Sequence, residues 1–285
     1  MAQKGDLMTA RSDIRVLDAT IRDGGLVNNF MFSDDFINAL YRTNVKAGVD
    51  YMEFGYKASK ELFDVNKFGK WKFCDEESIR EIVGDNNSDM KISVMADVGR
   101  CDYKKDIIDK KDSVIDMVRV ATYVHQMPAA IEMIEDAKAK GYEVTCNIMA
   151  ISNAKESDID QALEMVGQSS ADGIYIVDSY GALYPEQIRA IADKYTELGE
   201  KYGKYIGMHA HNNQQLCLCQ HDRSTLPRCQ SFRCYHDVHG TGCRKLCHGT
   251  ASEFSEKSKI KCIPGTPVLR RLYAAAQRNR CRMGI

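Results

Sequence analysis

The fold is decided by residues 117–151, which read "MVRVATYVHQMPAAIEMIEDAKAKGYEVTCNIMAI". The runs 117–123 and 142–151 are rich in β-branched residues, and each predicts a short strand. Between them, residues 127–141 place apolar side chains at three- and four-residue spacing, which is typical of an amphipathic helix that ends near Gly141. This order predicts two parallel strands joined by a right-handed helical crossover.

The same unit recurs along residues 14–213. Further β-rich runs lie at 14–20, 49–56, 91–97, 173–182 and 205–213, and further helical patterns lie at 33–48 and 184–203. Ser33 is a suitable N-cap for the first of these helices, and Gly48 is a suitable stop. The alternation predicts a TIM (β/α)8 barrel with seven recognisable strands, incomplete at its C-terminal end. The alternative is an open doubly wound sheet, but no glycine-rich phosphate turn follows the first strand.

The composition excludes several classes of protein. The 285 residues carry a formal net charge of −1, which implies no basic surface for nucleic acid. Residues 1–12 form an N-terminal arm without the apolar stretch of a secretory signal, and no apolar run is long enough to span a membrane. Of eleven cysteines only Cys74, Cys101 and Cys146 precede residue 216, and we interpret these three as reduced thiols of a cytoplasmic protein.

Polar residues gather where the predicted strands end, which is the end of a TIM barrel that carries the active site. His209 and His211 are two positions apart on one predicted strand, so their side chains project from the same face. Asp23 follows the first strand at the same end of the barrel. Two imidazoles and a carboxylate suit a divalent metal with open positions for a substrate. The alternative is a pair of structural or surface histidines.

Four motifs carry a resemblance to a known family. They are "LDATIRDGG" at 17–25, "VDYMEFGY" at 49–56, "VDSYGAL" at 177–183 and "GMHAHNN" at 207–213. In this order and spacing they resemble the metal-dependent superfamily of pyruvate aldolases and acyl-condensing TIM barrels. Its members include 4-hydroxy-2-oxovalerate aldolase, hydroxymethylglutaryl-CoA lyase and the isopropylmalate and homocitrate synthases. The resemblance covers residues 13–215, the expected catalytic domain, and the third motif favours the aldolase branch.

The resemblance implies a role for each site residue. Asp23, His209 and His211 would bind Mn²⁺ or Mg²⁺, and Arg22 would hold the keto acid and stabilise an enolate. Glu53 would line the site, or act as a structural partner of Arg22. Ser179 would contact the substrate, or form a turn. Asp178 is expected to anchor its loop by hydrogen bonds.

The implied reaction is cleavage of a 4-hydroxy-2-oxo acid to pyruvate and an aldehyde through a metal-stabilised enolate. Related aldolases place a histidine three residues after the metal aspartate, and this chain has Leu26 there, so the general base is left open. The alternatives are an acyl-CoA-dependent Claisen condensing synthase and an inactive truncated barrel. The expected partner is a small 2-oxo acid, with no nucleic acid and no membrane. A homo-oligomer or a companion dehydrogenase also remains open.

Residues 216–285 form an irregular tail that is rich in cysteine and histidine and lacks the expected last helix, strand and helix. A zinc module is one interpretation, although the spacings match no regular C-x-x-C pair. A shifted reading frame is the other. With suitable codons, a one-base shift turns residues 216–224, 228–236 and 248–257 into "FAFANTIE", "GVSLFDAT" and "TEQLLSFLK". These strings restore a helix, a strand and a helix in the expected order.

Overall fold

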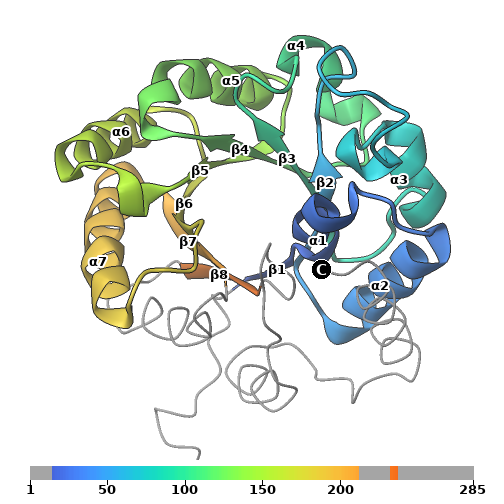
Figure 1. Ribbon diagram of the computed structural model, residues 1–285, viewed down its shortest axis with the longest axis horizontal. Coiled ribbons are helices and arrows are strands. Elements are labelled where there is room, and N and C mark those ends of the chain that lie inside the picture. The colour runs from blue at the N-terminus through green and yellow to red at the C-terminus, as the bar shows by residue number, and fades with distance from the viewer. Residues whose placement is uncertain (1–14, 212–231, 237–285) are drawn as a thin grey trace, which may run out of the picture.

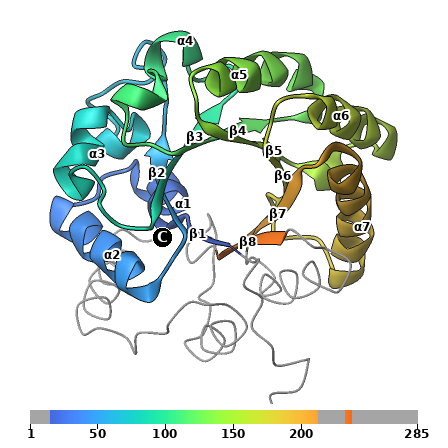
Figure 2. The ribbon, with the colours of Figure 1, turned by 180° about the vertical axis from the view of Figure 1, so that it is seen from behind.

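The computed structural model describes residues 15–211 and the backbone of residues 232–236. In this part of the chain, a closed ring of parallel strands is surrounded by helices, as Figures 1 and 2 show from opposite sides. The strands are β1 (Val16–Asp18), β2 (Tyr51–Tyr56), β3 (Lys91–Asp97), β4 (Met117–Thr122), β5 (Glu143–Ile148), β6 (Gly173–Asp178), β7 (Tyr205–Ala210) and β8 (Phe232–His236). They follow one another around the ring in chain order.

The α-helices alternate with the strands, and most of them lie outside this ring (Figure 1). They are α1 (Thr20–Asn28), α2 (Asp34–Ala47), α3 (Glu76–Val83), α4 (Tyr103–Asp106), α5 (Met127–Ala139), α6 (Glu156–Gln168) and α7 (Pro185–Tyr202). Short 3₁₀ turns lie in four of the loops: η2 (Lys70–Lys72), η3 (Lys110–Asp112), η4 (Val124–Gln126) and η5 (Ile151–Asn153). The TIM-barrel prediction, including its seven strands, is therefore confirmed.

The three helices predicted from apolar spacing are present as α2, α5 and α7. Ser33 caps α2 as expected, because its hydroxyl accepts the backbone N–H of Phe36 at 3.3 Å. Gly48 ends the same helix with a φ of 76°, a left-handed conformation that glycine adopts without strain. Local sequence signals thus fix the ends of this helix.

The large apolar core lies between the strands and the surrounding helices. Ile37 on α2, Ile134 on α5 and Ile174 on β6 are among its fully buried side chains. A second, smaller cluster includes Leu17 on β1 and Tyr175 on β6. Since β1 and β6 are not neighbours in the sheet, these two residues meet inside the ring, which is a packed interior rather than a pore.

The ring is closed by a strand that the sequence did not reveal. The sequence predicts a barrel with seven recognisable strands that is incomplete at its C-terminal end, and the structure adds an eighth strand there. Cys234 of β8 pairs with Val16 on β1 and with Met208 on β7, so both edges are hydrogen-bonded. The remainder of the tail 216–285 lies outside the described residues, as does the N-terminal arm 1–12. The zinc and reading-frame hypotheses therefore stay predictions.

Cys74, Cys101 and Cys146 are free thiols, as expected. Among the helices of the described part, none combines the length and the apolar character that a membrane crossing requires.

Candidate metal centre

Arg22 and Asp23 lie on α1, the helix that follows β1 directly. The sequence placed them at the end of the first strand, but β1 already ends at Asp18 and the chain turns into the helix at Thr20. Both side chains are buried at the C-terminal end of the strands. Gly25 lets this short helix pack closely, because a Cβ atom there would lie 2.1 Å from the ring of Phe30. Gly25, the last residue of the motif "LDATIRDGG", is therefore required by this packing.

The two histidines come from the end of β7, which only β8 separates from β1 in the ring. His209 lies on β7 and His211 follows it, and their ring centroids are 5.1 Å apart. The Nδ1 atom of His211 is 2.7 Å from the carbonyl oxygen of Ser179. Since a carbonyl only accepts hydrogen bonds, Nδ1 of His211 carries the proton and its Nε2 atom has a lone pair to offer. A backbone contact therefore selects the tautomer that a metal ligand needs.

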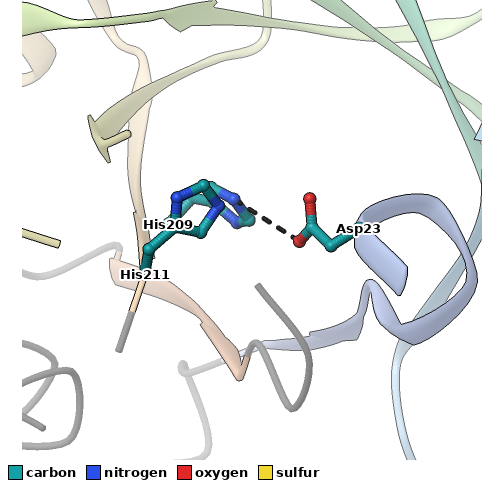
Figure 3. Close-up of side chains that lie close together, drawn as sticks. All are labelled: Asp23, His209 and His211. Carbon is teal, nitrogen blue, oxygen red and sulfur yellow. Dashed lines mark ion pairs between the residues drawn. The ribbon is translucent and has the colours of Figure 1, made fainter. Parts of the chain in front are cut away.

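Asp23, His209 and His211 converge on one point. Each offers one ligand atom, and these atoms all lie within 4.8 Å of one another. Figure 3 shows both imidazole rings facing the Asp23 carboxylate, whose Oδ2 atom is 3.6 Å from Nε2 of His209. Neither oxygen of Asp23 accepts a hydrogen bond from the described residues, although Oδ1 forms an ion pair with Arg22. A buried carboxylate beside two imidazoles fits a divalent cation.

Arg22 lies beside this group of ligands and is held by carboxylates. Its Nε atom donates to Oε2 of Glu53 at 2.8 Å, and its Nη1 atom forms an ion pair with Asp23. Burial alone would lower the pKa of Arg22, but Asp23 and Glu53 outweigh that effect and raise the pKa. The guanidinium is therefore a permanent positive charge at the mouth of the barrel.

Glu53 joins two arginines inside the ring. Its Oε2 atom also accepts a hydrogen bond from Nη1 of Arg119 on β4 at 2.7 Å, and all three side chains are buried. The Cζ atom of Arg119 lies 4.9 Å from the centre of the Tyr175 ring. Of the two roles predicted for Glu53, this geometry favours the structural partner of Arg22.

Ser179 and Asp178 belong to the loop after β6. The Ser179 hydroxyl accepts the backbone N–H of Ala150 at 2.9 Å, so the structure gives this side chain a loop contact, and its expected contact with substrate stays a prediction. Asp178 accepts the backbone N–H groups of Ala182 and Leu183, each at 3.1 Å. The expectation that Asp178 anchors the loop is confirmed.

Two inward-facing residues were missed from the sequence. Arg119 and Asn147 lie on β4 and β5, among apolar neighbours, and are 0% and 1% exposed. A charged or amide side chain inside an otherwise apolar strand was the available signal, because such groups are buried only with partners or ligands. Leu26, where the resemblance led us to expect a histidine, is 43% exposed on α1.

Curated proteins are similar to most of this chain. The chain is similar to 4-hydroxy-2-oxovalerate aldolase of Bacillus cereus, with 24% identity over 205 residues that cover 72% of this chain and 58% of the relative. It is also similar to oxaloacetate decarboxylase of Mycobacterium tuberculosis, with 28% identity over 222 residues that cover 74% of this chain and 61% of the relative. The chain thus matches about three fifths of the length of these curated relatives.

Solved structures share the fold. HMG-CoA lyase of Brucella melitensis has a TM-score of 0.64 at 13% identity, with 88% of this chain and 94% of that chain covered. The carboxyl transferase domain of pyruvate carboxylase from Rhizobium etli has a TM-score of 0.65 at 13% identity, with 90% and 45% covered. A family model described as HMGL-like matches residues 13–220. Because this match spans most of the chain, the protein belongs to the HMGL-like family.

Proposed function

We propose that the chain is a divalent-metal-dependent carbon–carbon lyase that cleaves a 4-hydroxy-2-oxo acid to pyruvate and an aldehyde. The observation that carries the proposal is the convergence of Asp23, His209 and His211 within 4.8 Å, beside the buried guanidinium of Arg22. The resemblance to 4-hydroxy-2-oxovalerate aldolases supports the choice of substrate class.

Asp23, His209 and His211 would hold Mn²⁺ or Mg²⁺. The bound cation would supply electron withdrawal from the keto group of the substrate. The rest of the chemistry falls to side chains of the protein. Arg22 supplies a fixed positive charge for the substrate carboxylate and for the negative charge that develops on the keto oxygen as the carbon–carbon bond breaks. Ser179 would complete the substrate-binding wall.

Glu53 keeps Arg22 in place for this role. An arginine side chain has several rotatable bonds, and fixing it before the substrate arrives removes an entropic cost from the reaction. Glu53 accepts from Arg22 and from Arg119, so the guanidinium of Arg22 is oriented from the interior of the barrel. The expected partners are a small 2-oxo acid and a homo-oligomer or companion dehydrogenase, in the cytoplasm.

The test is release of pyruvate from 4-hydroxy-2-oxopentanoate by the purified full chain, measured with and without Mn²⁺ or Mg²⁺ and with a chelator. We expect pyruvate only with the metal. His209→Ala and Asp23→Asn are expected to lose the activity, whereas the surface variant Asp75→Asn retains it. A parent chain that releases no pyruvate with any divalent metal would contradict the proposal and favour the inactive-barrel alternative. Consumption of acetyl-CoA with a 2-oxo acid would instead favour the condensing synthase.

A further inference from the structure

Cleavage of a 4-hydroxy-2-oxo acid needs a group that takes the proton of the hydroxyl. Three of the buried carboxylates at the C-terminal ends of the strands are already engaged. Asp23 belongs to the candidate metal centre, Glu53 accepts from two arginines, and Asp178 accepts from two backbone N–H groups. A carboxylate that is held by strong donors is a weak base, so none of these three suits the role.

Asp97 is a largely buried carboxylate at this end of the strands that is not held in this way. It is the last residue of β3, and its side chain is 12% exposed. Its Oδ1 atom has no hydrogen-bond partner among the described residues. Its Oδ2 atom lies 3.8 Å from Nη1 of Arg100, whose side chain is 63% exposed and therefore well hydrated. One oxygen of Asp97 thus remains available to accept a proton.

The strand register places Asp97 on the inner face of the barrel. Asp97 pairs with Ala121 on β4, Ala121 pairs with Asn147 on β5, and Asn147 pairs with Tyr175 on β6. Paired residues in a parallel sheet project from the same face. Tyr175 packs inside the ring against residues of β1 and β4, so the whole row faces the interior.

Asn147 supplies a hydrogen-bonding amide group in the same row as Asp97. It is 1% exposed, and neither its Oδ1 nor its Nδ2 atom has a hydrogen-bond partner in the described part of the chain. A hydroxyl group both donates and accepts, so it matches the two groups of an amide. Asp97 and Asn147 are two strand spacings apart, roughly 9–10 Å between Cα atoms. The residue between them in this row is Ala121, whose side chain is a single methyl group.

The electrostatic surroundings agree with a basic role. Burial raises the pKa of Asp97, while Lys72 from η2, Arg100 from the following loop and Arg22 from α1 lower it, and Glu53 from β2 raises it. The net shift is upward, which makes this carboxylate a stronger base than an exposed aspartate. Burial also lowers the pKa of Lys72, which weakens the opposing charge at high pH.

We propose that Asp97 is the general base that takes the proton of the substrate hydroxyl, and that Asn147 holds this hydroxyl in place. The inference rests on the proposed lyase function. As Asp97 takes the proton, the oxygen–hydrogen electron pair forms the aldehyde C=O bond. The C3–C4 bond breaks, and its electron pair moves to the pyruvate fragment, where the charge on the keto oxygen lies beside Arg22. The proton on Asp97 then returns to C3 of this fragment, so no further reactant is needed.

Two substrates separate this role from a structural one. Decarboxylation of oxaloacetate yields the same pyruvate fragment but involves no hydroxyl proton, and C3 of the fragment takes its proton from water. For Asp97→Asn, which keeps the shape of the side chain, we expect cleavage of 4-hydroxy-2-oxopentanoate to fall by about 10²–10⁴-fold. Oxaloacetate decarboxylation and calorimetric Mn²⁺ binding should stay close to those of the parent chain. The matched control is Asp102→Asn in the loop after β3, whose side chain is 37% exposed, and it should retain both activities.

The pH profile gives an independent check. Cleavage by the parent chain should decline as the pH falls through the raised pKa of Asp97, and the decarboxylation profile should lack that decline. Equal loss of both activities in Asp97→Asn, or no loss of cleavage, would overturn the assignment of the base while leaving the lyase function standing. A parent chain with neither activity would overturn the lyase function, and the assignment with it.

Discussion

The Nη2 atom of Arg22 lies 3.3 Å from the Nε2 atom of His209. Arginine has no acceptor, so this contact is a hydrogen bond only if His209 accepts through Nε2 and carries its proton on Nδ1. The same guanidinium forms an ion pair with Asp23 through Nη1. Arg22 therefore bridges two of the three candidate metal ligands, and its positive charge competes with a cation for both of them.

This competition predicts the behaviour of Arg22→Gln. Removing the guanidinium takes a positive charge away from the ligands, so Mn²⁺ should bind at least as tightly as to the parent chain, while pyruvate release is lost. Isothermal titration calorimetry and the pyruvate assay measure the two effects. Arg80→Gln, a change of a 40%-exposed side chain on α3, serves as the control. Weaker Mn²⁺ binding by Arg22→Gln would show that Arg22 supports the metal site instead.

The histidine pair predicts a loss of metal binding without a loss of the fold. The double variant His209→Ala, His211→Ala removes two of the three candidate ligand atoms, both at the end of β7, so most of the Mn²⁺ affinity should disappear. Calorimetric titration measures the affinity, and thermal melting checks the fold. His125→Ala, which changes a histidine stacked on Tyr123 away from the candidate metal centre, should bind Mn²⁺ normally. Unchanged binding in the double variant would rule out the assignment.

Glu53→Gln should be strongly destabilising. The change leaves Arg22 and Arg119 buried without the carboxylate that they share, and breaking a buried ion pair in this way costs roughly 3–5 kcal/mol. The free energy of unfolding in urea measures the cost. Asp75→Asn, which breaks the exposed Lys60–Asp75 pair, should cost about 1 kcal/mol or less. Similar costs for the two variants would mean that the Glu53 network contributes little to stability.

Asp97 also predicts how stability depends on pH. Its pKa in the folded state is raised from 3.8 by burial, so its contribution to stability is present below the unfolded pKa and is lost as the pH rises through the folded pKa. At neutral pH the parent chain carries the cost of a buried charge, and Asp97→Asn does not. The variant should therefore unfold with the higher free energy at neutral pH, and its advantage should shrink on acidification. An advantage that grows on acidification would contradict the direction of the shift.

The reading-frame hypothesis predicts that a one-base correction near codon 216 produces a better-folded chain. The match to the family model ends at residue 220, close to this point. In the corrected frame, "FAFANTIE", "GVSLFDAT" and "TEQLLSFLK" supply apolar faces that can be buried at roughly 1.5–3 kcal/mol for each large side chain, partly offset by the entropy of ordering them. The corrected chain should melt at a higher temperature and bind Mn²⁺ more tightly when both forms are expressed side by side. Higher stability and tighter binding by the present chain would show that its tail is genuine.

The sequence predicts the barrel well because the relevant signals are local. Each of β1 to β7 is a run of β-rich residues, the helices α2, α5 and α7 carry apolar stripes that a short window reveals, and α2 also carries an N-cap. The strand β8 was missed because "FRCYH" at 232–236 has no alternation of its own and lies in a segment without a clear period. Its place is set by hydrogen bonds to β1 and β7, which are distant in the chain.

The site shows the same difference between local sequence signals and contacts that join distant parts of the chain. His209, His211 and Asp23 were predicted because they stand in or soon after the strands β7 and β1, at the end of the barrel where its topology brings them together. The roles of Arg119, Asn147 and Asp97 depend on which side chains face each other across the interior. Only the strand register and the buried contacts reveal this relationship, and no short stretch of sequence contains it.

The pairing of Val16 with Cys234 has a consequence for the order of folding. The second edge of β1 can be hydrogen-bonded only after β8 has formed, and β8 lies near the other end of the described chain. Such long-range pairing slows folding, because loop-closure entropy is lost before the contacts that compensate for it can form. During synthesis on the ribosome, β1 therefore emerges early and stays open on one side until β8 follows. Closing the ring is therefore a late step. A chain in which the ring has not closed exposes the edges of β1 and β7, and such edges can pair with another chain.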